Sequence, residues 1–281
     1  MYPAGIAGVH THMLTTATGL RMRVVECGHA EGAPALLIHG WGACVYTYRF
    51  LLQALGAAGR RAVAFDLRGH GLSDKPVGRG RYAVDVLVSD VRDLIEGLGI
   101  ERADVVGHSM GGGLALHFAL AHPNRIRRLV LAAPVNLTRM GLPRIGHLLT
   151  PRVTDRFARY LTPRWLTSAL LRSTYGDPTK VSGHDIDEYW APSQFPAYYR
   201  ATRGLLEEFD WTPLSTDQLT SLACQTLVVL STADRLVQGA ESAALRIPRA
   251  AVVDLIGAGH LGVEECASDF NRMVVEFLQR E

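Results

Sequence analysis

The stretch VVGHSMGGG, Val105 to Gly113, places one serine among glycines directly after a short apolar run. Its two valines are expected to end a strand, and residues 111–122 to form a helix whose glycines allow close packing on that strand. Ser109 then lies at a strand-to-helix corner, near backbone N–H groups that have no helical partner. A serine in such a pattern can also be a plain turn residue, so its interpretation as a nucleophile depends on the rest of the chain.

Apolar runs rich in β-branched residues recur along the chain and alternate with stretches of helical periodicity. Runs that are apolar throughout suit strands covered on both faces, as in a parallel sheet flanked by helices. The expected strands are 35–39, 61–65, 103–107, 128–133, 226–230 and 251–256, and the expected helices are 46–58, 82–98, 110–122, 240–247 and 266–279. The alternation predicts an α/β fold with a mostly parallel central sheet.

The alternation stops between residues 135 and 223, where there are several prolines, separate helical patches and no clear strand. A segment of this size is too long for an ordinary connection. We therefore expect residues 135–223 to form a helical cap, inserted into a core domain made of residues 1–134 and 224–281.

Composition excludes several classes of protein. With 29 basic and 27 acidic residues, the net charge of +2 gives no sign of nucleic-acid binding. No uncharged apolar run reaches the roughly 20 residues of a transmembrane segment. The four cysteines are far apart, and no HExxH pattern occurs, so neither a disulfide framework nor a metal is expected. We expect a cytoplasmic protein without a cofactor.

A serine hydroxyl is a weak nucleophile unless a base takes its proton, so Ser109 needs a histidine and an acid elsewhere. Both follow predicted strands late in the chain: Asp234 in STADRLV and His260 in GAGHLG. Strands of an α/β sheet place such residues at their carboxyl edge, and the order Ser, Asp, His suits this arrangement. An oxyanion hole is expected from the backbone N–H groups of Trp41, in HGWGA at 39–43, and of Met110.

The other histidines are expected to be structural or superficial. His39 ends a strand beside Gly40, and His70 and His108 lie in loops at the carboxyl edge, where they are expected to shape the turns.

The motifs HGWGA, FDLRGHGLSD at 65–74, GHSMGG, the Asp234 loop and GAGHLG together resemble the α/β-hydrolase fold family, in the right order and over nearly the whole chain outside the insertion. The resemblance implies that Ser109 is the nucleophile, His260 the general base and acid, Asp234 the orienting acid, and Trp41 and Met110 the oxyanion donors.

The resemblance also has limits. Ser231 stands where the family often has glycine, and Gly262 where it often has proline. A serine at position 109 disfavours the epoxide hydrolase and haloalkane dehalogenase branches, which need a carboxylate nucleophile. Asp66, Arg68 and Asp74 match a family loop in which their role looks structural.

The cap is rich in aromatic and basic residues. Eleven of the chain's 21 aromatic residues lie in it: Phe157, Tyr160, Trp165, Tyr175, Tyr189, Trp190, Phe195, Tyr198, Tyr199, Phe209 and Trp211. Most should pack within the cap, and the rest could line an apolar acyl pocket.

Between residues 139 and 172 the cap carries seven arginines against one acid, Asp155: Arg139, Arg144, Arg152, Arg156, Arg159, Arg164 and Arg172. They are either a solvated face or a docking surface for an anionic partner, such as a membrane surface or an acidic acyl carrier protein.

These observations predict a serine carboxylic-ester hydrolase acting on a hydrophobic ester. Hydrolysis of a carbon–carbon bond, a lactone or a thioester, and perhydrolysis, stay open because they use the same triad. Carbon–carbon hydrolases are expected to have asparagine where His108 stands. A slow-turnover receptor that senses its ligand is the alternative of another class.

Overall fold

The computed structural model describes residues 1–139, 162–195 and 197–280. Its centre is an eight-stranded sheet with the order β1-β2-β4-β3-β5-β6-β7-β8. The strands are β1 (Val9–Thr15), β2 (Arg21–Gly28), β3 (Pro34–Ile38), β4 (Arg61–Phe65), β5 (Ala103–His108), β6 (Ile126–Ala132), β7 (Gln225–Ser231) and β8 (Ala250–Leu255). β2 pairs antiparallel with β1 and β4, and all other neighbours are parallel. The predicted α/β fold with a mostly parallel sheet is confirmed.

The apolar runs became strands because helices cover both faces of the sheet. Every residue of β5 is buried, as is every residue of β3 and β4 after the first. The antiparallel pair β1 and β2 was not among the expected strands. β1, with the sequence VHTHMLT, is largely exposed at the sheet edge, so it lacks the apolar run that identified the others.

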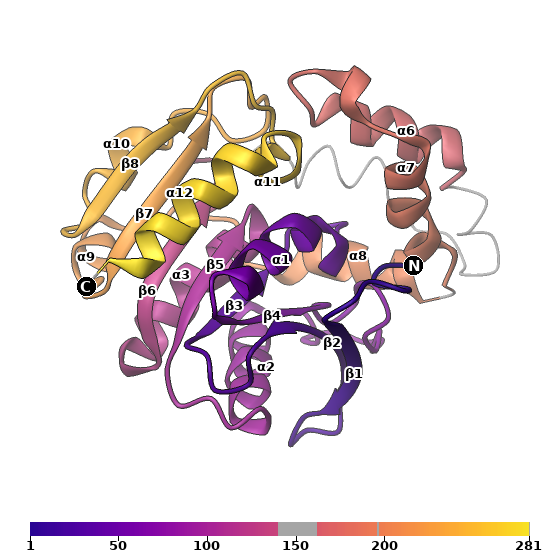
Figure 1. The fold of residues 1–281 in the computed structure, drawn as a ribbon, viewed down its shortest axis with the longest axis horizontal. Coiled ribbons are helices and arrows are strands. Elements are labelled where there is room, and N and C mark those ends of the chain that lie inside the picture. The colour runs from indigo at the N-terminus through magenta and orange to yellow at the C-terminus, as the bar shows by residue number, and fades with distance from the viewer. Residues whose placement is uncertain (140–161, 196, 281) are drawn as a thin grey trace.

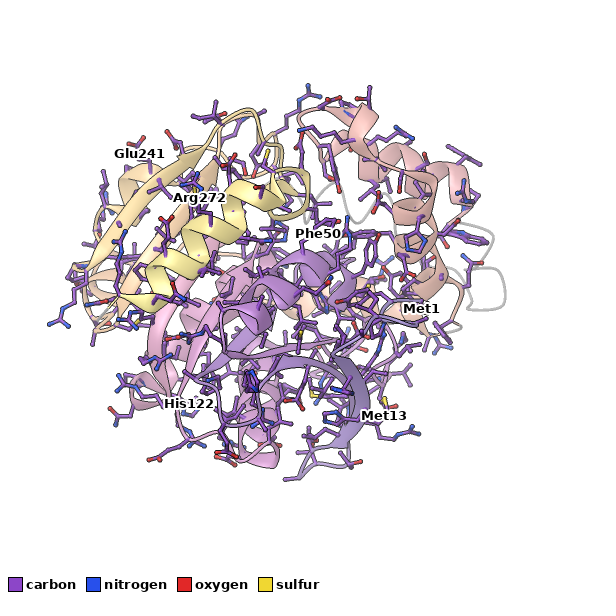
Figure 2. The ribbon with its side chains drawn as sticks, viewed as in Figure 1. Met1, Met13, Phe50, His122, Glu241 and Arg272 are labelled. Atoms are coloured by element: carbon purple, nitrogen blue, oxygen red, sulfur yellow. The ribbon has the colours of Figure 1, made fainter. Side chains whose placement is uncertain are left out.

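Helices pack on the two faces of the sheet in pairs. α1 (Arg49–Ala57) and α12 (Ala267–Gln279) lie in front of the sheet in Figure 1, and α2 (Val84–Gly97) and α3 (Met110–Ala121) lie behind it. Leu52 and Phe270 belong to the core on the first face, and Val91 and Leu114 to the core on the second. The labelled Met13 and His122 lie on the side of the molecule away from α6 (Arg164–Ser173) and α7 (Gly183–Trp190) (Figure 1, Figure 2).

One expected helix is much shorter than its pattern suggested. Instead of residues 240–247, α10 covers only Glu241–Ala244. Pro248 accounts for the exclusion of Ile247 from the helix, because the residue before a proline is pushed out of the α conformation.

The described part of the insertion is helical. It contains α6 (Arg164–Ser173), α7 (Gly183–Trp190), α8 (Tyr198–Glu208) and α9 (Thr216–Thr220), and residues 162–195 and 197–223 include no strand. The N-terminus lies close to α7, where Glu188 accepts hydrogen bonds from the amide of Tyr2 at 2.9 Å (Figure 1). Phe157, Tyr160, Arg144, Arg152, Arg156 and Arg159 lie outside the described residues. No helix within the described ranges is both long and apolar enough to cross a bilayer.

Candidate active site

Ser109 occupies the corner between β5 and α3 in a strained backbone conformation. Its φ is 55° and its ψ −119°, a region that side chains other than glycine rarely enter and that costs about 1–3 kcal/mol. Neighbouring strands hold the corner in place: the Ser109 amide donates to the carbonyl of Ala132 at 3.0 Å, and its carbonyl accepts from Gly113 and Val135, both at 3.1 Å. The sequence therefore folds into a turn that presents this one hydroxyl at the carboxyl edge of the sheet.

Two glycines allow the corner to be this sharp. A Cβ on Gly107 would lie 2.4 Å from the carbonyl oxygen of Gly111, and a Cβ on Gly111 would lie 2.1 Å from that of Ile38. Both distances are shorter than any contact between non-bonded atoms allows. The helix start and two strands meet here backbone to backbone, as the glycine pattern around Ser109 predicted.

His260 and Asp234 complete a chain of hydrogen bonds with Ser109. His260 follows β8, and its Nε2 lies 2.8 Å from the Ser109 Oγ. On the other side of the ring, Nδ1 lies 2.8 Å from Oδ2 of Asp234, which follows β7. All three residues are buried. The structure thus brings together three side chains that are far apart in the sequence, in the geometry of a nucleophile, a base and an orienting acid.

Asp234 is held in its ionised form by its surroundings. Its other oxygen, Oδ1, accepts hydrogen bonds from the amides of Leu236 at 2.7 Å and Val237 at 3.0 Å. Burial by itself would raise the pKa of this carboxyl, but the hydrogen bond and charge of His260, together with the two amides, outweigh it and hold the pKa of Asp234 below its usual range. A carboxylate in this position fixes the imidazole with its proton on Nδ1 and leaves Nε2 free to accept one.

The loop after β3 packs against Ser109. A Cβ on Gly40 would lie 3.0 Å from the Cβ of Ser109, so the loop that carries Trp41 touches the corner. The Trp41 indole Nε1 donates to the carbonyl of Thr202 in α8 at 2.8 Å. Met110 is the first residue of α3, so its amide has no carbonyl one turn earlier in the helix to bond to. The two residues predicted to supply oxyanion donors therefore flank Ser109 from two different segments.

Three other buried histidines surround this site and have structural contacts. His39 Nε2 accepts from the amide of Leu67 and His70 Nε2 from the amide of Gly42, both at 3.0 Å. His108 does more than shape the turn, because its Nε2 donates to the carbonyl oxygen of His260 at 2.8 Å. Burial lowers the pKa of all three, and burial together with His260 lowers that of His108 to about 3.

These buried neutral histidines predict that acid destabilises the fold. The unfolded chain binds protons at histidine below about pH 6.5 while His39, His70 and His108 stay neutral in the folded protein, so the free energy of unfolding should fall as the pH falls below that value. Each contributes a slope of up to about 1.4 kcal/mol per pH unit. Urea unfolding between about pH 7 and about pH 4.5 should show a shallower slope for His108→Asn than for the wild type.

An exposed histidine supplies the control for that comparison. His29 is exposed just after β2, so His29→Asn should keep the slope of the wild type. Equal slopes for His108→Asn and the wild type would show that His108 takes up its proton in the folded state as readily as in the unfolded one.

The acidic and basic residues of the loop after β4 have structural roles, as expected. Asp66 accepts hydrogen bonds from the amides of Val45 and Leu72, both at 2.8 Å. Arg68 forms a two-pronged ion pair with Asp90 at 2.6 and 2.7 Å. Asp74 accepts from the amide of Arg21 at 2.8 Å. This loop supports the site without reaching Ser109.

A separate cavity of about 500 Å³ lies beside the N-terminal segment, between α1, α7 and the short helix α11 (Gly262–Glu265). Arg49 bridges Asp185 of α7, at 2.9 Å, and Glu264 of α11 within it. Phe50, labelled in Figure 2, also lines the cavity and is 43% exposed. None of Ser109, Asp234 and His260 lines this cavity, so it lies apart from the candidate active site.

Glu265, the residue after Glu264, was not among the site residues expected from the sequence. Its carboxylate accepts a hydrogen bond from the amide of Gly259, next to His260, at 2.8 Å. No motif marks it, since a glutamate at the end of a short helix is ordinarily a solvated residue. Within the described ranges, no three His, Cys, Asp or Glu side chains gather as metal ligands would.

The chain is similar to known proteins in sequence and in fold. Residues 34–266 match the family model described as alpha/beta hydrolase fold. Human epoxide hydrolase 4 is 32% identical over 124 residues, which are 44% of this chain and 34% of that protein. The dihydrolipoyllysine-residue acetyltransferase component of the acetoin cleaving system of Pseudomonas putida is 31% identical over 93% of this chain and 68% of its own length.

The solved structure of a meta-cleavage product hydrolase from Pseudomonas fluorescens IP01 is similar over nearly its whole length. Its TM-score is 0.79 at 26% sequence identity, with 95% of this chain and 97% of that chain covered. The chain spans only about a third of the length of three epoxide hydrolases that it matches. The matched segments are 34%, 29% and 34% of those proteins.

Proposed function

This chain belongs to the alpha/beta hydrolase fold family, and from that premise we propose that it is a serine hydrolase of hydrophobic carboxylic esters. The observation that carries the proposal is the hydrogen-bond chain from Ser109 Oγ through His260 to Asp234, with both links at 2.8 Å. A serine so placed has a base for its proton, and the base has an acid to stabilise the charge that it gains.

In the proposed acylation step, Ser109 Oγ attacks the ester carbonyl while His260 Nε2 takes the hydroxyl proton. The negative charge that develops on the carbonyl oxygen is met by the amides of Trp41 and Met110. His260 then gives its proton to the alkoxide oxygen as the ester C–O bond breaks, and the alcohol leaves. An acyl group is left on Ser109.

Water completes the proposed cycle by the same route. His260 takes a proton from a water molecule, whose oxygen attacks the acyl carbonyl. The tetrahedral intermediate collapses, the bond to Ser109 Oγ breaks, and His260 returns the proton to that oxygen. The carboxylic acid is released and the enzyme is restored.

The position of the insertion, beside the loop that carries Trp41, supports the proposal of an apolar substrate. We propose that residues 135–223 act as a cap over a core made of 1–134 and 224–281. Helix α8 of this insertion contacts the oxyanion loop, since Thr202 accepts from Trp41 and the Tyr198 hydroxyl donates to the Gly42 carbonyl at 3.4 Å. Tyr198 is buried, so one aromatic side chain lies next to the loop that would hold the substrate carbonyl.

A hydrolase of carbon–carbon bonds is the second candidate, and the likeness to the meta-cleavage product hydrolase favours it. His108 argues against it, because we expect asparagine at this position in such enzymes. An epoxide hydrolase is disfavoured despite the sequence similarity, since that chemistry needs a carboxylate where this chain has Ser109.

The location of the protein and an anionic partner of the cap are inferred mainly from the sequence. We place the protein in the cytoplasm because its four cysteines are unpaired. An anionic partner at the arginine-rich part of the cap would depend on the exposed Arg139 and on arginines outside the described ranges, because Arg164 and Arg172 already bond to Asp187 and to the carbonyls of Pro178 and Val181.

A series of activated esters of increasing acyl length tests the substrate class. We expect kcat/KM to rise by about tenfold over the first two added methylenes, since each buried CH₂ stabilises the complex by about 0.8 kcal/mol. The series should be run beside a lactone, a thioester and a dienone, with Ser109→Ala as the control. Turnover of the dienone alone would identify a carbon–carbon hydrolase, and one equivalent of product followed by silence would identify a sensor.

A further inference from the structure

We propose that Glu265 is a positioning residue that ties the loop of His260 to the helical insertion; the proposal rests on the serine hydrolase function proposed above. Glu265 ends α11, and no part of its side chain is exposed. Its Oε2 accepts from the amides of Gly259 and Gly176, both at 2.8 Å, and its Oε1 accepts from the amide of Asp177 at 2.7 Å. One buried carboxylate therefore joins three amides.

The three amides belong to two segments that are far apart in the sequence. Gly259 directly precedes His260, whereas Gly176 and Asp177 follow α6 in the insertion. Hydrogen bonds to an ionised acceptor are roughly twice as strong as those between neutral groups. The carboxylate thus fixes the insertion to the peptide next to the proposed base.

The two backbones also touch directly. A Cβ on Gly259 would lie 2.4 Å from the carbonyl oxygen of Thr174, and a Cβ on Gly176 would lie 2.1 Å from that of Gly257. The amide of Leu261 donates to the Thr174 carbonyl at 3.2 Å. Because no side chain lies between the segments, a displacement of the insertion at residues 174–177 must move the histidine loop at 257–261.

The histidine loop is held on both sides of its catalytic residue. Glu265 holds the amide of Gly259 before it, and the buried His108 donates to the carbonyl of His260 itself at 2.8 Å. With these two points fixed, the His260 ring keeps Nε2 within 2.8 Å of Ser109 Oγ. A displacement of about 1 Å between reacting groups lowers the rate about 100-fold, so the restraint bears on catalysis as well as on stability.

Graded variants separate the carboxylate's role from simple loss of a residue. Glutamine has one acceptor oxygen, so Glu265→Gln can keep the bonds to Gly259 and Gly176 but turns an N–H group toward the amide of Asp177. Glu265→Ala loses all three bonds. Lys180→Ala is the matched control, because Lys180 Nζ lies 3.9 Å from the same carboxylate with a 48% exposed side chain, and its removal leaves the three amide bonds in place.

The test is the saturation kinetics of inactivation by an alkyl fluorophosphonate. In this reaction Ser109 Oγ forms a bond to phosphorus, the P–F bond breaks, fluoride leaves and His260 takes the serine proton. We expect Glu265→Ala to lower the limiting inactivation rate about 10- to 100-fold, with the half-saturating concentration within about threefold of the wild type. The limiting rate of Glu265→Gln should lie between those of Glu265→Ala and the wild type. The rate of Lys180→Ala should match that of the wild type.

A spectroscopic readout accompanies the kinetics. The imidazole proton between His260 Nδ1 and Asp234 gives a low-field proton NMR signal, which should broaden or move in Glu265→Ala and stay unchanged in Lys180→Ala. An unchanged limiting rate, or a change confined to the half-saturating concentration, would overturn the positioning role while leaving the proposed function intact. A wild type that is not labelled at all would overturn both. If Glu265→Ala does not fold, Glu265→Gln decides by the same criteria.

Discussion

Replacing Ser109 by alanine is expected to lower kcat for ester hydrolysis by about three to six orders of magnitude. The variant keeps the amides of Trp41 and Met110 but has no hydroxyl oxygen to form the proposed acyl-enzyme, so only attack of water on the bound ester remains. Steady-state kinetics on the best ester of the acyl series measures the loss. Thermal unfolding should show a folded protein, because one buried hydroxyl is removed and no cavity larger than an atom is left.

Ser221→Ala is the matched control for that variant. Ser221 is exposed at the end of α9, far from the carboxyl edge of the sheet, so its removal should leave kcat unchanged. If Ser109→Ala retained more than about a tenth of the wild-type kcat, another residue would have to carry the chemistry.

Replacing Asp234 by asparagine is expected to lower kcat by about four orders of magnitude. The amides of Leu236 and Val237 both donate to Oδ1, so the asparagine must place its oxygen there and its NH₂ group toward His260. His260 Nδ1 then becomes an acceptor and the ring proton moves to Nε2, which faces Ser109 Oγ. A base that already holds a proton at that nitrogen cannot take the serine's.

Asp254→Asn provides the control, because Asp254 lies exposed in β8 and the change removes the same charge from a neighbouring strand. It should leave kcat within about twofold of the wild type, as surface substitutions usually do. A kcat for Asp234→Asn within tenfold of the wild type would mean that the orientation of His260 does not depend on this carboxylate.

The parts of the fold that the sequence predicted are those in which burial leaves a pattern. β5 is buried at every position and is apolar enough to be recognised, and Leu87, Val91 and Ile95 mark the covered face of α2 at helical spacing. The edge strand β1 was not predicted because most of its residues face solvent and form no apolar run. The length of α10 was overestimated because the apolar pattern of 240–247 does not mark the helix end at Ala244.

Some residues of the candidate site are marked by sequence motifs, and others are not. Ser109, Asp234 and His260 are recognisable because each lies in a loop motif directly after a strand, and the topology of a parallel sheet brings such loops together. Glu265 and the contact of His108 with His260 were not predictable, since both act on backbone groups. A backbone acceptor or donor leaves no trace in the sequence of the residue that carries it.

The proposed hydrolysis requires Ser109 to be a nucleophile, and the mass of the intact protein after treatment with a fluorophosphonate tests this most directly. Peptide mapping should find one phosphonyl group, on Ser109, and none on the Ser109→Ala variant. An unmodified wild type, or an adduct on any other residue that appears equally in Ser109→Ala, would contradict the proposed serine hydrolase.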